Sequence, residues 1–298
     1  MPVLIEQVFG GSWTKEKLTR LRKYLEAYTM IFTKNPRAKL LTRIYVDAFA
    51  GSGIRSTGSN KEESPDGLLF ERDDDASAFM NGSARVALEI APPFHRYVFI
   101  EKDPDFAREL ENVRSDFPGI ADRIEIMTGD ANSVLVEWIN STSWHGQRAV
   151  VFLDPYGMQV EWQTIEAIAR TKAIDLWLLF PLGQGVNRLL TREGPPPEAW
   201  ANRLTTMFGT DSWREAFYRP SSQLGLFSEE PHLEKSANFD SIMQYFLDRL
   251  DSVFAKVAPS PLVLRNSRNN PIFLLCFAAA NEKGAPTAVR IAQDLLKD

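Results

Sequence analysis

The sequence predicts an α/β fold, in which helices cover both faces of a mostly parallel sheet. Apolar runs of strand length recur at residues 45–49, 97–101, 124–128, 149–153 and 174–180, with helical patterns between several of them. Strands that alternate with helices in this way form parallel sheets, and a run that is apolar throughout suits a strand buried on both faces. Two later runs, 262–264 and 272–279, flank a turn-rich segment and predict an antiparallel hairpin.

The first strand ends in a glycine loop. Gly51 and Gly53 follow residues 45–49, and glycines leave backbone N–H groups open to a closely approaching ligand. The loop differs from the dinucleotide fingerprint, because Ser56 stands where that pattern requires a third glycine. Asp47, just before the loop, suits instead a site for S-adenosylmethionine (SAM), in which a carboxylate meets the methionine ammonium. A plain glycine turn without a ligand is the alternative.

Acidic residues also end the next two strands. Glu101 stands where nucleotide-binding α/β folds place the acceptor for the ribose hydroxyls, and Asp103 could replace it. Asp130 follows the third strand, where a carboxylate of SAM enzymes commonly accepts from the adenine amino group. Together with the first loop, these positions predict a SAM site. The residues expected to contact the cofactor are Asp47, Phe49, Gly51, Gly53, Glu101, Lys102, Asp130 and Ala131.

The interval between Asp47 and Glu101 is longer than this fold requires. It spans 54 residues, where about 20 is usual. Residues 54–81 lack a sustained apolar period and contain many turn formers, which predicts an inserted surface loop. Such a loop could act as a lid over the cofactor, or it could be a connection without a role.

The fourth strand ends in Asp154-Pro155-Tyr156-Gly157, which suggests a reaction. Enzymes that methylate an exocyclic amino group of a base commonly carry an Asp or Asn, two prolines and an aromatic residue here. Asp154 and the Pro155 carbonyl could accept the two amino hydrogens, and Tyr156 could stack on the base. The motif departs from this pattern of the adenine enzymes, because Tyr156 directly follows Pro155 and Gly157 comes next. It more closely resembles the Asp-Pro-Phe-Gly motif of the tRNA guanosine dimethyltransferases. Asp-Pro is also a common turn starter after a strand.

The chain resembles the three-Cys-motif partner proteins of bacteria and phages. The resemblance runs through the helix before the glycine strand and the motifs at 45–53, 99–103 and 152–157. It continues through the helix that begins at Trp162, the strand 175–180 and the motif at 183–188. It implies a SAM-methyltransferase-like, Rossmann-like fold and a partnership with a radical-SAM protein that carries three cysteines. It implies no established substrate.

Composition agrees with a globular enzyme. The chain has 298 residues, of which 44% are hydrophobic and 24% charged, with a net charge of −5. Cys276, the single cysteine, lies in the longest apolar run, of nine residues, which is far too short to span a membrane. The three histidines are scattered, so we expect no metal site. A cytoplasmic location is expected, since no signal peptide or disulfide framework is evident.

The N-terminal segment is strongly basic. Residues 12–43 carry nine Lys or Arg against two Glu, a local balance of +7. Apolar residues recur there at spacings of three and four, so residues 1–44 are expected to form an amphipathic helix packed on the core. The basic face of residues 15–43 could contact the phosphates of a nucleic acid, or it could simply be solvated.

The remaining organisation follows from these elements. The methyltransferase-like domain is expected to comprise residues 45–180 and 261–298, and residues 181–260 to form a helical insertion with helices at 198–208, 213–218 and 239–257. Residues after the strands can meet a substrate at the carboxyl edge of the sheet. The residues expected there are Gly157, Gln184, Asn187 and Arg188.

The sequence favours a SAM-dependent methyltransferase acting on an amino group of a nucleobase in RNA or DNA. Two other functions stay open. In one, the chain is a non-catalytic SAM-binding or scaffold partner of the radical-SAM protein. In the other, it methylates a small molecule or peptide and the basic helix has no role in substrate binding.

Overall fold

A computed structural model describes residues 12–51, 82–221 and 233–297. Gly53, the predicted loop at 54–81 and its lid role lie outside the described residues. The central sheet contains five parallel strands: β1 (Thr42–Asp47), β2 (Arg96–Glu101), β3 (Ile124–Thr128), β4 (Gln147–Leu153) and β5 (Ile174–Phe180). Their spatial order is β3-β2-β1-β4-β5. The predicted α/β fold with a mostly parallel sheet is confirmed.

An antiparallel strand closes the sheet beside β5. Strand β10 (Pro271–Ala279) pairs with β5, and β9 (Leu262–Arg265) pairs with β10 as the predicted hairpin. A short strand, β8 (Lys256–Val257), pairs with the last residues of β10. Strands β8 and β9 thus form one edge, interrupted by Pro259 and Pro261, which cannot donate ladder hydrogen bonds.

The position of β8 corrects one expectation. The apolar pattern predicted a single helix to residue 257, whereas α10 (Phe239–Asp251) ends six residues earlier. Residues 252–255 form a turn instead of a further helical turn, although Phe254 packs in the core. Helical spacing continued through the turn because the turn and β8 also place apolar side chains inward.

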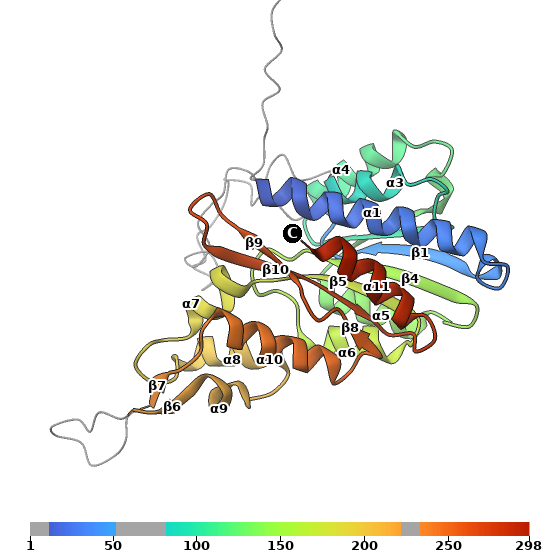
Figure 1. Ribbon diagram of the computed structural model, residues 1–298. Helices are drawn as coiled ribbons and strands as arrows, with labels where there is room; N and C mark the ends of the chain where they lie inside the picture. The colour runs from blue at the N-terminus through green and yellow to red at the C-terminus, as the bar shows by residue number, and fades with distance from the viewer. Residues whose placement is uncertain (1–11, 52–81, 222–232, 298) are drawn as a thin grey trace, which may run out of the picture.

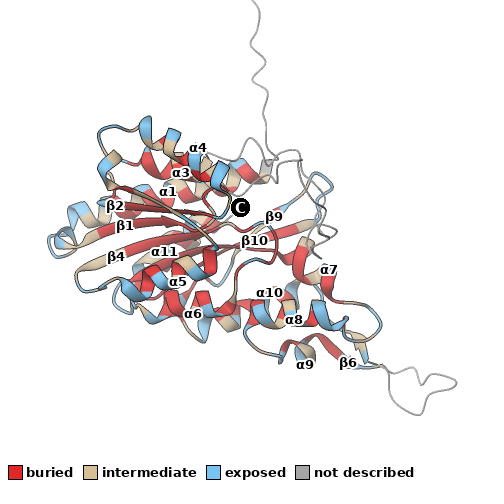
Figure 2. Cartoon of the chain, turned by 180° about the vertical axis from the view of Figure 1, so that it is seen from behind, coloured by how far each residue is buried: buried red, intermediate tan, exposed pale blue. Residues whose placement is uncertain are grey.

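Helices cover both faces of the sheet in three layers (Figure 1). One face is covered by α1 (Ser12–Lys34), α3 (Gly82–Leu88), α4 (Pro104–Ser115) and α11 (Ala285–Leu296). The other face carries α5 (Ala131–Ser141) and α6 (Trp162–Arg170). Figure 2 shows the strands buried between these layers, as an apolar parallel sheet requires.

Helices follow β5 in the segment predicted as an insertion. A single π-helical turn, η4 (Leu182–Val186), leads into α7 (Asn187–Leu189), α8 (Glu198–Phe208) and α9 (Trp213–Phe217). A small antiparallel pair, β6 (Tyr218–Pro220) and β7 (Leu233–Lys235), precedes α10. Phe180 at the end of β5 stacks on Phe246 of α10 with ring centroids 3.9 Å apart, so these helices share the core of the sheet.

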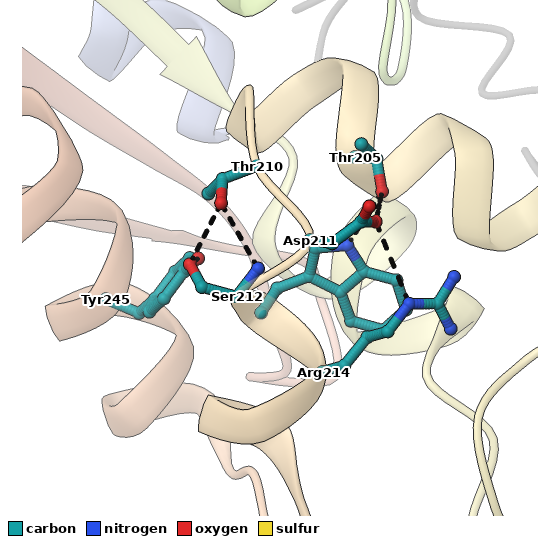
Figure 3. Close-up of polar contacts among 7 residues, drawn as sticks. Thr205, Thr210, Asp211, Ser212, Arg214 and Tyr245 are labelled. Atoms are coloured by element: carbon teal, nitrogen blue, oxygen red, sulfur yellow. Dashed lines mark hydrogen bonds and ion pairs between the residues drawn. The ribbon is translucent and has the colours of Figure 1, made fainter.

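Polar contacts fix α8, α9 and α10 to one another (Figure 3). Thr205 donates to Asp211 and accepts from the indole N–H of Trp213, over 2.6 Å and 3.0 Å. The Ser212 hydroxyl lies 2.8 Å from that of Tyr245 on α10. Since these contacts join α8, the turn at 209–212, α9 and α10 to one another, this cluster is a structural connection.

Candidate functional site

The carboxyl ends of β1 and β4 bring two predicted site residues to one edge of the sheet. Asp47 is the last residue of β1 and lies in register with Phe152 of β4. Asp154 follows two residues after Phe152, directly beyond the end of β4. Parallel strands end at the same edge, which is where ligands bind in open α/β sheets.

A lysine from the N-terminal helix completes this group. Lys17 Nζ lies 2.5 Å from Asp154 Oδ2, and the two side chains are 2% and 14% exposed. The ammonium also lies over the ring of Trp13, 5.1 Å from its centroid. Lys17 was predicted on the basic outer face of the helix, and that position was wrong, because the side chain points inward.

The other basic residues of this segment are not all on the outer face. Arg43 is buried at the start of β1, so it does not belong to an outer face either. Arg20 and Arg22 form ion pairs with Glu16 and Glu89. The exposed cations of this segment are Lys15, Lys23, Lys34, Arg37 and Lys39.

Asp47 is a fully buried carboxylate. Its Oδ1 accepts from the Phe49 N–H over 3.3 Å, and Oδ2 has no hydrogen-bond partner of good geometry among the described residues. Burial raises the pKa of Asp47 to about 7. Of its polar neighbours, the Ser83 hydroxyl lowers this pKa, the Asp154 carboxylate raises it and Lys17 lowers it. A buried carboxylate with a spare oxygen suits a cationic ligand.

Glu101 holds the backbone of the glycine loop. Its Oε2 accepts from the Gly51 N–H over 2.9 Å and its Oε1 from the Asp103 N–H over 2.7 Å. A Cβ at residue 51 would lie 2.9 Å from Phe106 Cβ and 3.0 Å from Glu101 Oε2. Gly51 is therefore required by this contact with Glu101, in addition to any ligand. A carboxylate has about four acceptor positions, so Glu101 retains room for hydroxyl donors.

Asp130 caps α5. Its Oδ1 accepts from the N–H groups of Asn132 and Ser133, over 3.1 Å and 3.2 Å. The side chain is exposed at the carboxyl end of β3, and Ala131 behind it is buried. Lys102, between the second strand and its helix, is exposed.

Asn132 connects α5 to the loop after β4. Its Nδ2 donates to the Gln159 carbonyl over 2.8 Å, and its Oδ1 accepts from the Glu161 N–H over 3.0 Å. Within that loop Pro155 is buried, Tyr156 is 42% exposed and Gly157 has a φ of 80°, which favours glycine. The backbone turn at Gly157 thus places Tyr156 at the surface beyond β4.

The residues after β5 are placed mainly by packing. Gly183 lies against β10, since a Cβ there would meet the Pro271 carbonyl oxygen at 2.0 Å. The oxygens of Asn187 accept from Lys235 Nζ of β7, over 3.0 Å for the carbonyl and 2.8 Å for the side chain. Gln184 is half-buried and Arg188 is exposed. Asn187 has a structural partner that the sequence did not indicate.

A groove of about 660 Å³ lies beside β3 and α5, and none of the predicted site residues lines it. Arg96 and Glu125, which form an ion pair, and Trp138 are among its lining residues. In the described part of the chain, no group of His, Cys, Asp or Glu could hold a metal ion. No described helix is both long enough and apolar enough to cross a membrane.

Lys17 is the site residue that the sequence analysis missed. A signal was present, because residue 17 precedes the buried Leu21 and Tyr24 by four and seven positions. These spacings place all three side chains on one helix face. The charge of Lys17 favoured the outer face and outweighed this spacing.

No protein-family model and no curated protein sequence matches the chain. Among solved structures, a Legionella pneumophila protein is 13% identical with a TM-score of 0.46, covering 96% of this chain and 92% of its own. An O-methyltransferase from Bacillus cereus in complex with S-adenosylhomocysteine is 13% identical with a TM-score of 0.35, covering 93% of both chains. Fibrillarin from Aeropyrum pernix with bound SAM is 10% identical with a TM-score of 0.31, covering 80% of this chain and 66% of its own. The strand order itself shows a Rossmann-like α/β fold with an antiparallel strand beside β5.

Proposed function

We propose that this protein is a SAM-dependent methyltransferase whose acceptor is an exocyclic amino group of a nucleobase. One observation carries the proposal: the neighbouring strands β3, β2, β1 and β4 end at one edge, and their ends carry acidic side chains. In strand order these are Asp130, Glu101, Asp47 and Asp154. The antiparallel β10 beside β5 supports a methyltransferase over a NAD-binding enzyme.

The residues fit the cofactor by their chemistry. Among the described residues, Asp47 Oδ2 is buried without a hydrogen-bond partner of good geometry, and it could accept from the methionine ammonium. Glu101 and Asp130 would accept from the ribose hydroxyls and the adenine amino group. When bound, SAM supplies a methyl group already activated on sulfur, so catalysis depends mainly on orientation. Phe49, Lys102 and Ala131 remain proposed neighbours of the cofactor.

Asp154 and Pro155 would orient the acceptor. Lys17 engages Asp154 Oδ2, so Asp154 Oδ1 could accept one amino hydrogen. The Pro155 carbonyl could accept the other. Accepting hydrogen bonds from both N–H groups would direct the nitrogen lone pair toward the methyl group. The exposed Tyr156 ring would stack on the base, with Gly157, Gln184 and Arg188 beside it. The resemblance of the sequence to the three-Cys-motif partner proteins further suggests a radical-SAM protein with three cysteines as partner.

Two measurements test this function. Calorimetry with SAM should show saturable binding, and labelled SAM should transfer its methyl group to total RNA or DNA. If SAM binds but methyl transfer occurs only in metabolite extracts, the acceptor is a small molecule and not a nucleobase. SAM binding without any transfer would favour a scaffold partner. Absence of SAM binding would contradict the proposal as a whole.

A further inference from the structure

Three basic side chains gather at the opposite edge of the sheet. Arg43 is the second residue of β1, His95 immediately precedes β2, and Arg123 ends the short helix η3 (Ala121–Arg123) before β3. Arg43 and Asp47 are four residues apart on β1, so roughly 13 Å of strand separates this cluster from the proposed methyl-transfer site. None of the ion pairs found in the described residues includes Arg43 or Arg123.

The hydrogen bonds of His95 fix where its proton lies. Its Nδ1 accepts from the Arg43 backbone N–H over 2.9 Å, so the neutral ring carries its proton on Nε2. The Nη2 of Arg43 lies 3.4 Å from that Nε2. Both atoms are then donors, and two adjacent donors call for a shared acceptor.

The guanidinium of Arg43 is also incompletely paired. The residue is 7% exposed, and its Nη2 donates to the Pro93 carbonyl over 3.2 Å. Its Nε is buried with no hydrogen-bond partner in the described part of the structure. Arg123 directs Nη1 to the Phe94 carbonyl over 3.3 Å, which leaves its remaining donors available.

The electrostatic surroundings agree with this geometry. Burial, followed by the charges of Arg43 and Arg123, lowers the pKa of His95. The same burial lowers the pKa of Arg43, whose polar neighbours are Tyr28 of α1 and Tyr97 of β2. These groups form a positive, donor-rich cluster, and no acidic side chain of the described residues forms an ion pair with it.

We propose that Arg43, His95 and Arg123 form a binding site for a phosphate group. A tetrahedral oxyanion could accept from His95 Nε2–H and Arg43 Nη2 with one oxygen and from Arg123 with another. Arginine forks match phosphate geometry and keep their charge at all relevant pH values. The site does not depend on the proposed methyl transfer.

Nuclear magnetic resonance of the full chain tests this site with inorganic phosphate as the probe. Phosphate replaces chloride at constant pH and ionic strength, and the ring resonances of His95 report binding. A saturable shift and a higher His95 pKa in phosphate are expected. No saturable shift of His95 would overturn the proposal.

Variants separate a phosphate site from general surface charge. Arg123→Gln, at a half-buried position, should weaken phosphate binding about tenfold or more, since a charge-assisted bond is lost. Arg43→Gln should do so too, and Arg123→Gln decides the matter if the buried Arg43 variant does not fold. Arg96→Gln is the matched control, because Arg96 pairs with Glu125 and should leave binding unchanged. Equal phosphate affinity in folded Arg123→Gln and wild type would contradict the site.

The source of the phosphate is distinguished by two further probes. A single-stranded RNA oligonucleotide without terminal phosphates offers only phosphodiesters, and ribose 5-phosphate offers a monoester. Tighter, Arg123-dependent binding of the oligonucleotide identifies a nucleic-acid backbone as the source. Tighter, Arg123-dependent binding of the monoester identifies a phosphorylated small molecule.

Discussion

The ammonium of Lys17 forms a 2.5 Å ion pair with the carboxylate of Asp154, 137 residues later in the chain. This pair joins the N-terminal helix α1 to the end of β4, at the edge where Asp47 is also buried. Lys17 therefore pairs with Asp154, and its charge also lowers the pKa of the neighbouring Asp47. Helix α1 belongs to the proposed site instead of only covering the sheet.

Replacing Lys17 by methionine, which has a similar length, should destabilise the protein. Asp154 would keep its charge without a counter-charge beside the buried Asp47, and breaking such a pair costs about 3–5 kcal/mol. Urea denaturation measures the loss in the free energy of unfolding. Lys23→Met on the exposed face of α1 is the control and should change it by less than about 0.5 kcal/mol. Equal stability of the two variants would show that the pair is not maintained in solution.

The affinity for SAM should rise with pH through neutrality. The free protein holds Asp47 with a pKa of about 7, and binding an ammonium there requires the ionised form. Below that pKa a proton must leave on binding, so affinity should fall about tenfold from pH 8 to pH 6. Calorimetry over this range measures the dependence.

Asp47→Asn should remove this pH dependence and weaken SAM binding. Asp175→Asn is the control, since Asp175 is a second buried carboxylate, with a pKa raised to about 6 by burial, but it accepts from Tyr24. Its variant should keep the wild-type dependence of SAM affinity on pH. If SAM affinity still depends on pH in the Asp47→Asn variant, another group is responsible for the pH dependence.

The sequence predicted the sheet well because its strands are rich in apolar residues, as buried parallel strands require. Strand β5 and helix α8 begin and end at the expected residues, and α6 begins at the expected Trp162. The two-residue strand β8 could not be predicted, since its formation depends on pairing with β10 and not on its own sequence.

The site was less predictable than the sheet. The positions of Asp47, Glu101 and Asp154 followed from the ends of their strands. Some partners of the site residues come from distant segments, as Lys17 does for Asp154 and Lys235 does for Asn187. Such pairs depend on tertiary packing, which cannot be predicted from the spacing of residues along the chain.

Gly183→Ala should destabilise the fold through backbone contact. Its Cβ would lie 2.0 Å from the Pro271 carbonyl oxygen, so η4 and β10 would have to separate. Overpacking of this kind costs about 1–3 kcal/mol. Gly119→Ala is the control, because a Cβ there meets nothing within 4 Å. Thermal unfolding compares the two, and equal melting temperatures would contradict the close approach of η4 to β10.

If the acceptor is a nucleic acid, the exposed cations of α1 and the following turn should contact its phosphates. Changing Lys15, Lys23, Lys34 and Arg37 to Glu should lower the slope of log affinity against log salt. The reduction should be about 0.9 per lost contact on duplex DNA and about 0.7 on single strands. SAM affinity should stay unchanged, which serves as the internal control. A salt slope equal to that of wild type would exclude this face from phosphate binding.

Methyl transfer by Asp154→Ala tests the central claim most directly. Because Lys17 loses its partner in this variant, turnover, SAM affinity and melting temperature must be measured on the same preparation, well below that melting temperature. With labelled SAM and the nucleic acid that wild type methylates, we expect a folded, SAM-binding variant whose transfer rate is about 10²- to 10³-fold lower, as for loss of one transition-state contact. Asp154→Asn, which retains an accepting oxygen, should lose less. A folded Asp154→Ala protein that transfers methyl groups at the wild-type rate would contradict the account.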